Sequence, residues 1–233
     1  MNGYFTDNNV SHTAMKAFSR AGIPVRHISR FDNTKRGIFY GMLRGCGMAM
    51  RILKDRGIDY WYVDNGYFDA QYLDLTKHKN MSGKYRIVKN QMIEPFTGSP
   101  ARVEPFKKLK LLLLPPSPYS AFMHDITPED WMVEIVALCN KLGHTWADRK
   151  KDEQKPLVKS LSGYDGMVAF NSMGIMAAID QGLAAFTTHG VIRNIDMLGK
   201  CVPHYDVEAL RKYYEPKQFT LAEIQELGIK CLQ

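Results

Sequence analysis

The sequence predicts an α/β fold in which parallel sheets carry helices on both faces. The clearest observation lies between residues 166 and 190, where two apolar runs, 167–170 and 183–186, flank a helix-forming stretch at 173–180. Short apolar runs bounded by polar residues are typical of buried strands, and a strand, a helix and a strand in this order form one unit of a parallel sheet. Similar runs alternate with helical stretches elsewhere in the chain, which is the pattern of a doubly wound sheet.

The first half of the chain supplies the elements of one predicted domain. The sequence favours a helix at 11–21, a strand at 25–28, a helix ending at Asp55, a strand at 58–63 and another strand at 85–88. Ser11 suits the start of the first helix and Gly22 its end. The strand at 58–63 is rich in β-formers and runs into Asp64-Asn65-Gly66, a strong turn signal.

The second half follows a stretch at 97–108 that we expect to be a linker because it contains Gly98, Pro100 and Pro105. Its predicted elements are a strand at 109–114, a helix at 128–142, a strand at 145–148, a short helix at 153–160, the strand–helix–strand unit, and closing helices at 206–214 and 221–227. Thr127 and Pro128 give the second element a typical helix start. In the strand–helix–strand unit, Asn171 and Ser172 are expected N-cap residues and Gly182 the C-terminal stop.

Bulk composition predicts an ordinary globular protein of the cytoplasm. The hydrophobic fraction is 45% and the charged fraction 24%, and no apolar run approaches the ~20 residues that a membrane span needs. The N-terminal residues lack the pattern of a signal peptide. The four cysteines are scattered, which favours reduced, buried thiols over a zinc site. The net charge of +7 fits a polyanionic partner, although proteins that never bind nucleic acid also carry such an excess.

Several features that favour phosphate binding follow the predicted strands of the second half. They are Ser117 and Tyr119 after the first strand, Arg149, Lys150 and Lys151 after the second, Asn171, Ser172 and Met173 after the third, and His189 and Arg193 after the fourth. Ligands of open parallel sheets bind at this edge, where helix N-termini present N–H groups to anions. The alternative is a solvated basic loop and an ordinary helix cap. The chain has neither a Gly-x-Gly-x-x-Gly dinucleotide motif nor a P-loop.

Seven short pieces stand in one order along the chain, at residues 40–45, 57–68, 83–90, 115–117, 149–151, 170–172 and 218–224. Together they resemble small GT-B glycosyltransferase-like proteins of bacteriophages, which are related to capsular-polysaccharide-type transferases and include enzymes that glycosylate hydroxymethylated pyrimidines in DNA. The resemblance spans nearly the whole chain. Each piece is weak alone, and the ordered set is more specific for the fold than for the acceptor.

The resemblance implies two Rossmann-like domains with a cleft between them. Residues 1–105 would bind the acceptor, and residues 106–233 the nucleotide sugar, with the C-terminal helix packing back on the first domain. The residues that would hold the donor are Ser117, Tyr119, Arg149, Lys150, Asn171, Ser172, Met173, His189 and Arg193. Arg149 would also assist catalysis by stabilising the leaving diphosphate, so neither a metal nor a cofactor is expected beside the donor, for which a UDP sugar is the first choice.

One departure from the GT-B pattern concerns the donor ribose. Many GT-B enzymes carry a glutamate about one turn into the helix that follows the third strand, and this chain has Met176 there. The ribose contact and the identity of the donor are therefore left open.

The first domain would bind the acceptor, and Asp64 is the first candidate for the general base that removes the acceptor's hydroxyl proton. The alternative is a turn residue in Asp-Asn-Gly. Asp32, Asp69 and His12 are second candidates. The residues that would contact DNA are Arg44, Asn65, Tyr67, Phe68, Lys84, Arg86 and Lys89.

An aromatic group in the first half has two interpretations. Its members are Tyr60, Trp61, Tyr62, Tyr67, Phe68 and Tyr72. Aromatic rings next to Lys84, Arg86 and Lys89 are suited to stack on an extruded base, but alternating aromatic residues also fill the core of an α/β domain. The core is favoured for Tyr60 and Tyr62.

The sequence therefore predicts a glycosyltransferase that moves a sugar from a nucleotide sugar to the 5-hydroxymethyl group of a pyrimidine in double-stranded phage DNA. Hydroxymethylcytosine and hydroxymethyluracil are both compatible with it, and no membrane partner is expected. Two alternatives remain: a transferase of the same fold with a polysaccharide or lipid-linked acceptor, and a non-catalytic nucleotide- or DNA-binding protein on a GT-B scaffold.

Overall fold

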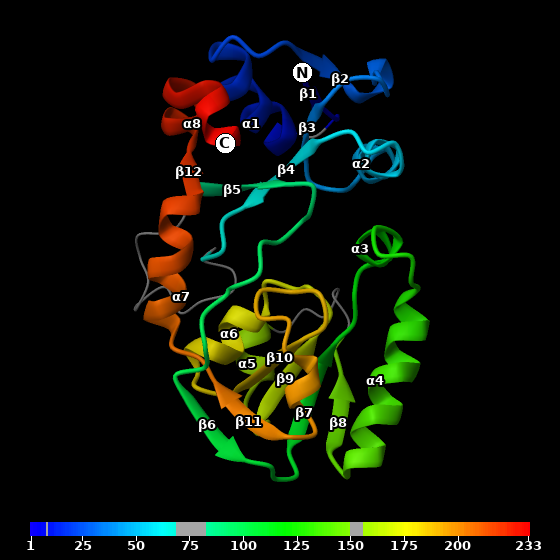
Figure 1. Ribbon diagram of the computed structural model, residues 1–233, viewed down its shortest axis with the longest axis vertical. Coiled ribbons are helices and arrows are strands. Elements are labelled where there is room, and N and C mark those ends of the chain that lie inside the picture. Colours follow the sequence, from blue (N-terminus) through cyan, green and yellow to red (C-terminus); the bar gives the residue numbers. More distant parts are fainter. Residues whose placement is uncertain (8, 69–82, 150–155) are drawn as a thin grey trace. The chain divides into compact units, whose positions relative to one another are not determined.

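The computed structural model describes residues 1–7, 9–68, 83–149 and 156–233. Contacts along the chain divide it into two compact units (Figure 1). The first unit takes in the strands β1 to β5 and the segment Glu215–Gln233, and the second unit takes in Ile93–Tyr214. The second unit is thus inserted in the sequence of the first. The division falls after Met92, upstream of the boundary expected after residue 105.

The first unit contains a six-stranded sheet with the order β12-β5-β4-β3-β1-β2. Its strands are β1 (Asn2–Phe5), β2 (Val25–His27), β3 (Gly37–Tyr40), β4 (Tyr60–Asn65), β5 (Lys84–Lys89) and β12 (Gln218–Thr220). The first four are parallel to one another, whereas β5 pairs antiparallel with both β4 and β12. The parallel strands therefore have the order 2-1-3-4, an arrangement found in doubly wound folds.

Helices cover both faces of this sheet. They are α1 (Asn9–Arg20), α2 (Cys46–Asp55) and α8 (Leu221–Leu227). Phe18 of α1 and Ile224 of α8 belong to one buried cluster with Trp61 of β4. Side chains along a strand alternate between the two faces of the sheet. Leu53 of α2 lies close to Gly37, which shares a face of β3 with Phe39. The helix α2 therefore covers the face opposite to the one that α1 and α8 cover.

The second unit contains a parallel four-stranded sheet with the order β10-β9-β7-β8. Its strands are β7 (Lys110–Leu114), β8 (Thr145–Asp148), β9 (Gly166–Ala169) and β10 (Ala184–Thr187), and β6 (Arg102–Pro105) pairs separately with β11 (Cys201–His204). Its helices are α3 (Pro118–Phe122), α4 (Pro128–Leu142), α5 (Leu157–Ser160), α6 (Ile175–Asp180) and α7 (Val207–Tyr214). The main sheet repeats the order 2-1-3-4 of the first unit.

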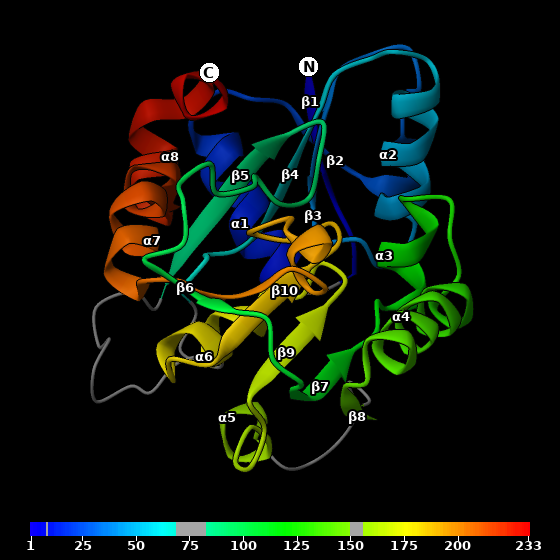
Figure 2. The ribbon, with the colours of Figure 1, turned by 60° about the horizontal axis from the view of Figure 1, so that its bottom comes forward.

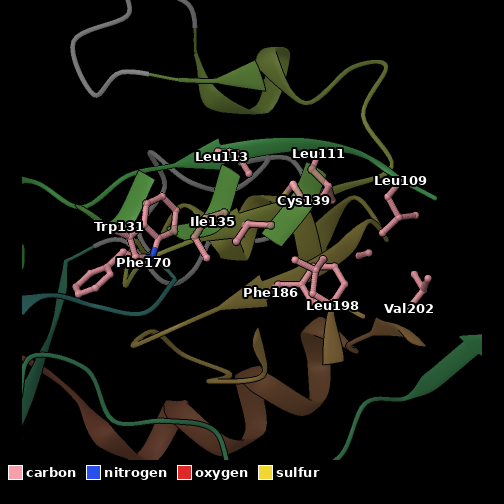
Figure 3. Packing of buried hydrophobic residues seen from close by; sticks show 12 residues of the cluster. Leu109, Leu111, Leu113, Trp131, Ile135, Cys139, Phe170, Phe186, Leu198 and Val202 are labelled. Carbon is pink, nitrogen blue, oxygen red and sulfur yellow. The ribbon is translucent and has the colours of Figure 1, made fainter. Parts of the chain in front are cut away.

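The core of the second unit lies between its main sheet and α4 (Figure 3). Trp131 and Ile135 of α4 pack with Leu111 and Leu113 of β7 and with Phe170, which directly follows β9. The helix α6 contacts β9 and β10. Figure 2 shows α4 beside β8 and α6 beside β10. The sheet is therefore flanked by helices from different parts of the chain.

The α/β class with parallel sheets is confirmed, and the two units are consistent with a GT-B-like fold. Two local predictions are wrong. The stretch 97–108 is not a plain linker, because it contains β6. The turn at Asp64-Asn65 is absent, since β4 continues through these residues and pairs Asn65 with Tyr85. Pairing with a neighbouring strand supplies hydrogen bonds that outweigh local turn propensity.

Candidate functional site

Both parallel sheets change winding direction between their first and third strands, and ligands of open α/β sheets bind at the carboxyl ends of the strands at such a point. In the second unit the two strands are β7 and β9. The loops that leave them, at residues 115–117 and 170–174, carry several residues of the predicted donor site. This edge is therefore the candidate site of the second unit.

The loop after β7 is held in place by short hydrogen bonds. The Ser117 hydroxyl accepts the backbone N–H of Ser120 at 3.2 Å and caps α3, which begins with Pro118. The Ser120 hydroxyl in turn donates to the Asn171 Oδ1 at 2.7 Å. This bond ties α3 to the loop after β9, so that Ser117 and Asn171 are brought together across the switch point.

The loop after β9 differs from the predicted helix cap. The helix α6 begins at Ile175, and its N-cap is Gly174, so Asn171 and Ser172 precede the helix. The Ser172 hydroxyl accepts the N–H of Gly174 at 3.0 Å and closes a small turn. A Cβ at Gly174 would lie only 2.6 Å from the Leu157 side chain, so this position has no room for a side chain unless Leu157 moves.

The two methionines of this segment are core residues. Met173 and Met176 are both buried in the second unit. The backbone of Met173 lies at the edge of the sheet, but its side chain is not available to a ligand. Burial also accounts for an apolar residue at position 176, where many GT-B enzymes carry a glutamate.

The loop after β10 is fixed by a second set of bonds. The N–H of His189 donates to the Phe170 carbonyl at 2.8 Å, and the Trp131 indole donates to the Thr188 hydroxyl at 3.2 Å. The Thr187 hydroxyl accepts the N–H of Arg193 at 2.9 Å. Arg193 has a left-handed backbone with φ of 43° and an exposed side chain. These bonds place a histidine and an exposed cation at the edge that carries Asn171.

His124, which sequence analysis did not select, lies in the same group. Its ring centroid is 4.5 Å from that of His189 and 5.2 Å from that of Phe170. Burial, followed by the charge of Arg193, lowers the pKa of His189, so this imidazole is uncharged near neutral pH. His124 lies in the turn between α3 and α4. In the sequence it stands between the predicted strand at 109–114 and the predicted helix at 128–142, and this position was the available signal.

The remaining predicted donor residues lie in neighbouring loops. The N–H of Arg149, directly after β8, donates to the Leu113 carbonyl at 3.0 Å. Tyr119 is 51% exposed on α3. Lys150 and Lys151 lie outside the described residues. The described members of the predicted donor set thus share one edge of one sheet, while their role in donor binding stays a prediction.

In the first unit, Asp64 belongs to a buried network centred on Arg86. The Asp64 carboxylate accepts hydrogen bonds from the Tyr62 hydroxyl at 2.5 Å, from Arg86 Nη2 at 2.8 Å and from the N–H of Asn65 at 2.8 Å. Arg86 is 5% exposed and also donates to the carbonyls of Asn65 and Met92. Burial and the neighbouring Asp64 charge raise the pKa of Tyr62 well above its usual value. This network joins the ends of β4 and β5.

The predicted DNA contacts of the first unit separate into exposed and buried residues. Arg44 is exposed in the loop after β3, and Lys89 is 53% exposed and pairs with Asp59 at 2.9 Å. Lys84 pairs with Glu215 at 2.5 Å, and Asn65 accepts a hydrogen bond from Tyr40 at 3.3 Å.

Three predicted DNA contacts are buried in this structure. Arg86 lies in the network described above, and Tyr67 and Phe68 are each 1% exposed. Tyr60, Trp61 and Tyr62 are buried as well, so the described members of this aromatic group all belong to the core. Tyr72 lies outside the described residues. The core interpretation of the aromatic group therefore applies to each member that the structure describes.

The second candidates for a base differ in their surroundings. Hydrogen bonds from Thr34 and the charge of Lys35 lower the pKa of Asp32 to about 2. His12 is exposed at the start of α1, with its ring 5.1 Å from that of Phe5. Asp69 lies outside the described residues.

Comparisons with known proteins include a distant structural match. No protein-family model matches the chain, and no curated protein matches it. A β-Kdo 2,4 transferase, KpsC of Thermosulfurimonas dismutans, matches with a TM-score of 0.42 and 11% identity over 83% of each chain. A match at this level carries no argument about activity. Within the described residues, no helix is long and apolar enough to cross a membrane, and no three potential metal ligands of the His, Cys, Asp and Glu types cluster.

Proposed function

We propose that this chain is a glycosyltransferase that binds a nucleotide-sugar donor at the carboxyl edge of the main sheet in the second unit. The observation that carries this proposal is the Ser120–Asn171 bond, which joins the loops after β7 and β9 at the switch point. The loops at the same sheet edge carry Ser117, Ser172 and Arg193, whose side chain is exposed. Hydroxyl groups and a cation at this position suit the phosphates of a nucleotide.

The chemistry proposed for this edge is electrostatic. Glycosyl transfer releases a nucleoside diphosphate, on which negative charge grows as the bond to the sugar breaks. Arg193, and Arg149 in the loop after β8, would stabilise that charge, and the hydroxyls of Ser117 and Ser172 would orient the phosphates. A UDP sugar is the first donor to test. No metal or cofactor enters this proposal.

The acceptor that we propose is the 5-hydroxymethyl group of a pyrimidine in double-stranded DNA. The net charge of +7 supports it, as do the exposed cations Arg44 and Lys89 of the first unit. Arg86, Tyr67 and Phe68 are omitted from the proposed contact surface because they are buried.

Asp64 stays the proposed general base. An ionised carboxylate has about four lone-pair sites, and three donors occupy sites on Asp64. The remaining site is the one with which this carboxylate would accept the acceptor's proton. Asp32 and His12 stay as second candidates.

The test is to incubate the protein with a panel of nucleotide sugars and duplex DNA that contains hydroxymethylcytosine, hydroxymethyluracil or unmodified pyrimidines. Nucleoside mass spectrometry should show a sugar-sized gain on one modified base. Ser172→Ala and Arg193→Ala should lose most of this gain, whereas Lys200→Ala should retain it, because Lys200 is an exposed residue paired with Asp196. Donor binding without DNA modification would point to a glycan acceptor, and absence of donor binding would refute the proposal.

A further inference from the structure

The rings of His124, Phe170 and His189 form a cluster at the candidate donor edge, in which each ring contacts the other two. The centroid of His189 lies 4.5 Å from that of Phe170 and 4.5 Å from that of His124, and the rings are tilted by 33° and 55°. The two histidines come from different loops, one after α3 and one after β10. The backbone bond from His189 to the Phe170 carbonyl fixes this contact.

The ring cluster contains a buried polar atom that ring packing alone does not explain. The Nδ1 atom of His189 is buried and has no hydrogen-bond partner among the described residues. A buried polar atom left unpaired costs about 1–3 kcal/mol, and such atoms often mark a functional position.

The surroundings of His189 disfavour a positive charge on its ring in the absence of a ligand. Arg193, on the loop after β10, is the charged group whose field lowers the pKa of His189, in addition to burial. Phe170, which directly follows β9, contributes an uncharged ring that contacts both histidines and packs in turn against Trp131 of α4. Asp125, next to His124 in the chain, is exposed. Protonation of both imidazoles of a contacting pair is unfavourable, because the two positive charges repel each other. An anion at this edge would reverse the sign of the local potential.

We propose that His124 and His189 form an anion-binding pair that takes up one proton from the solvent when a phosphoryl group binds beside it. The proton adds to an imidazole nitrogen and is supplied by the buffer, so no other bond forms or breaks. This inference rests on the proposed function for the presence of phosphate at this edge. It goes further by naming the group that balances the phosphate charge.

Proton uptake makes binding depend on pH in a defined direction. The phosphate-bound pair holds a proton that the free pair lacks near neutral pH. Affinity should therefore fall by up to about tenfold for each pH unit between the pKa of the free pair and the higher pKa of the bound pair, because one proton is linked to binding. Below that pKa, the free pair already holds the proton and the dependence disappears.

The first measurement uses the unmodified protein and UDP as the probe. Calorimetric titrations at pH 8, where the phosphates of UDP are fully ionised, are run in buffers of different ionisation enthalpy. The difference in observed heat gives the number of protons taken up, and a value near one is expected. Inorganic sulfate, which keeps its two charges throughout, serves as a second probe, followed by the ring signals of histidine in NMR titrations.

Variants then locate the proton. His124→Gln and His189→Gln should each abolish proton uptake and weaken UDP binding by at least about tenfold at pH 7, which is the effect of one linked proton over one pH unit. His27→Gln, which removes a histidine of the first unit, should leave both unchanged. Circular dichroism verifies that each variant is folded, and the measurement on the unmodified protein stands even if a variant does not fold.

The outcomes separate this inference from the proposed function. UDP binding without proton uptake, and with an affinity independent of pH between 6 and 8, would overturn the histidine pair while leaving the transferase proposal intact. Proton-linked UDP binding without sugar transfer to any acceptor would support the pair and count against the transferase. If neither UDP nor sulfate binds, the pair is overturned together with the phosphate site.

Discussion

Replacing Arg86 with methionine tests what holds the ends of β4 and β5 together. Arg86 donates to the Asp64 carboxylate at 2.8 Å, to the Met92 carbonyl at 3.3 Å and to the Asn65 carbonyl, and its guanidinium lies over the Tyr62 ring with its carbon 5.6 Å from the ring centroid. Methionine keeps the length of the side chain but donates no hydrogen bond. The variant therefore removes one donor from the Asp64 carboxylate and one from each of the two carbonyl groups, while the carboxylate keeps its bonds from Tyr62 and Asn65.

The size of the effect follows from burial. Removing one partner of a buried ion pair costs about 3–5 kcal/mol. The Asp64 side chain is 28% exposed and can recover some hydration, so the loss should lie near the lower end of this range, at about 3 kcal/mol. With about 2–4 °C of melting temperature per kcal/mol for a chain of this size, the first unit should melt about 6–12 °C earlier.

Scanning calorimetry and urea denaturation measure this loss. The matched control is Lys89→Met on the same strand. The Lys89 side chain is 53% exposed, against 6% for Arg86, so its ion pair with Asp59 should contribute no more than about 1 kcal/mol. If Arg86→Met destabilises the protein by the same small amount as Lys89→Met, the network does not anchor the sheet and the reasoning is refuted.

Three further predictions concern other parts of the chain. Asp64→Asn leaves the buried Arg86 without its counter-ion and should cost about 3 kcal/mol in urea denaturation; a fully stable but inactive variant would show that catalysis is its main role. Thr220→Ala removes the capping box of α8 and should cost about 1 kcal/mol by the same method, a value that an unchanged midpoint would contradict. Burial raises the pKa of Cys46 to about 12, so its thiol stays protonated and should not react with iodoacetamide at pH 8 until the protein unfolds; rapid labelling of the native protein would disprove this.

Elements with strong local signals could be predicted from the sequence. The start of α4 at Pro128, with Thr127 as its cap, and its end before Gly143 depend on neighbouring residues only. The strands β1 and β3 escaped prediction because each holds a glycine at a buried position. A Cβ at Gly37 would lie 2.5 Å from the Phe39 ring, and one at Gly3 would lie 3.0 Å from Val25, so packing requires residues that resemble strand breakers in the sequence.

In the candidate site, too, local sequence signals could place some residues, whereas contacts between distant segments could not be predicted. One sheet edge could be predicted to carry Ser117, Asn171 and Ser172, because these residues lie in the loops that follow predicted strands. The bond between Asp64 and Arg86 depends on the antiparallel register of β4 and β5, which no local pattern encodes. The meeting of His124 with His189 likewise depends on the fold of two loops.

The insertion of the second unit into the first has a consequence for synthesis on the ribosome. The segment 215–233 adds β12 to the edge of β5, and the Leu232 carbonyl accepts a hydrogen bond from the Trp61 indole at 3.0 Å. These residues are translated after the whole second unit. A nascent chain that has not yet reached residue 215 therefore exposes the unpaired edge of β5 and the indole of Trp61, a surface that chaperones recognise and that promotes aggregation when synthesis stalls.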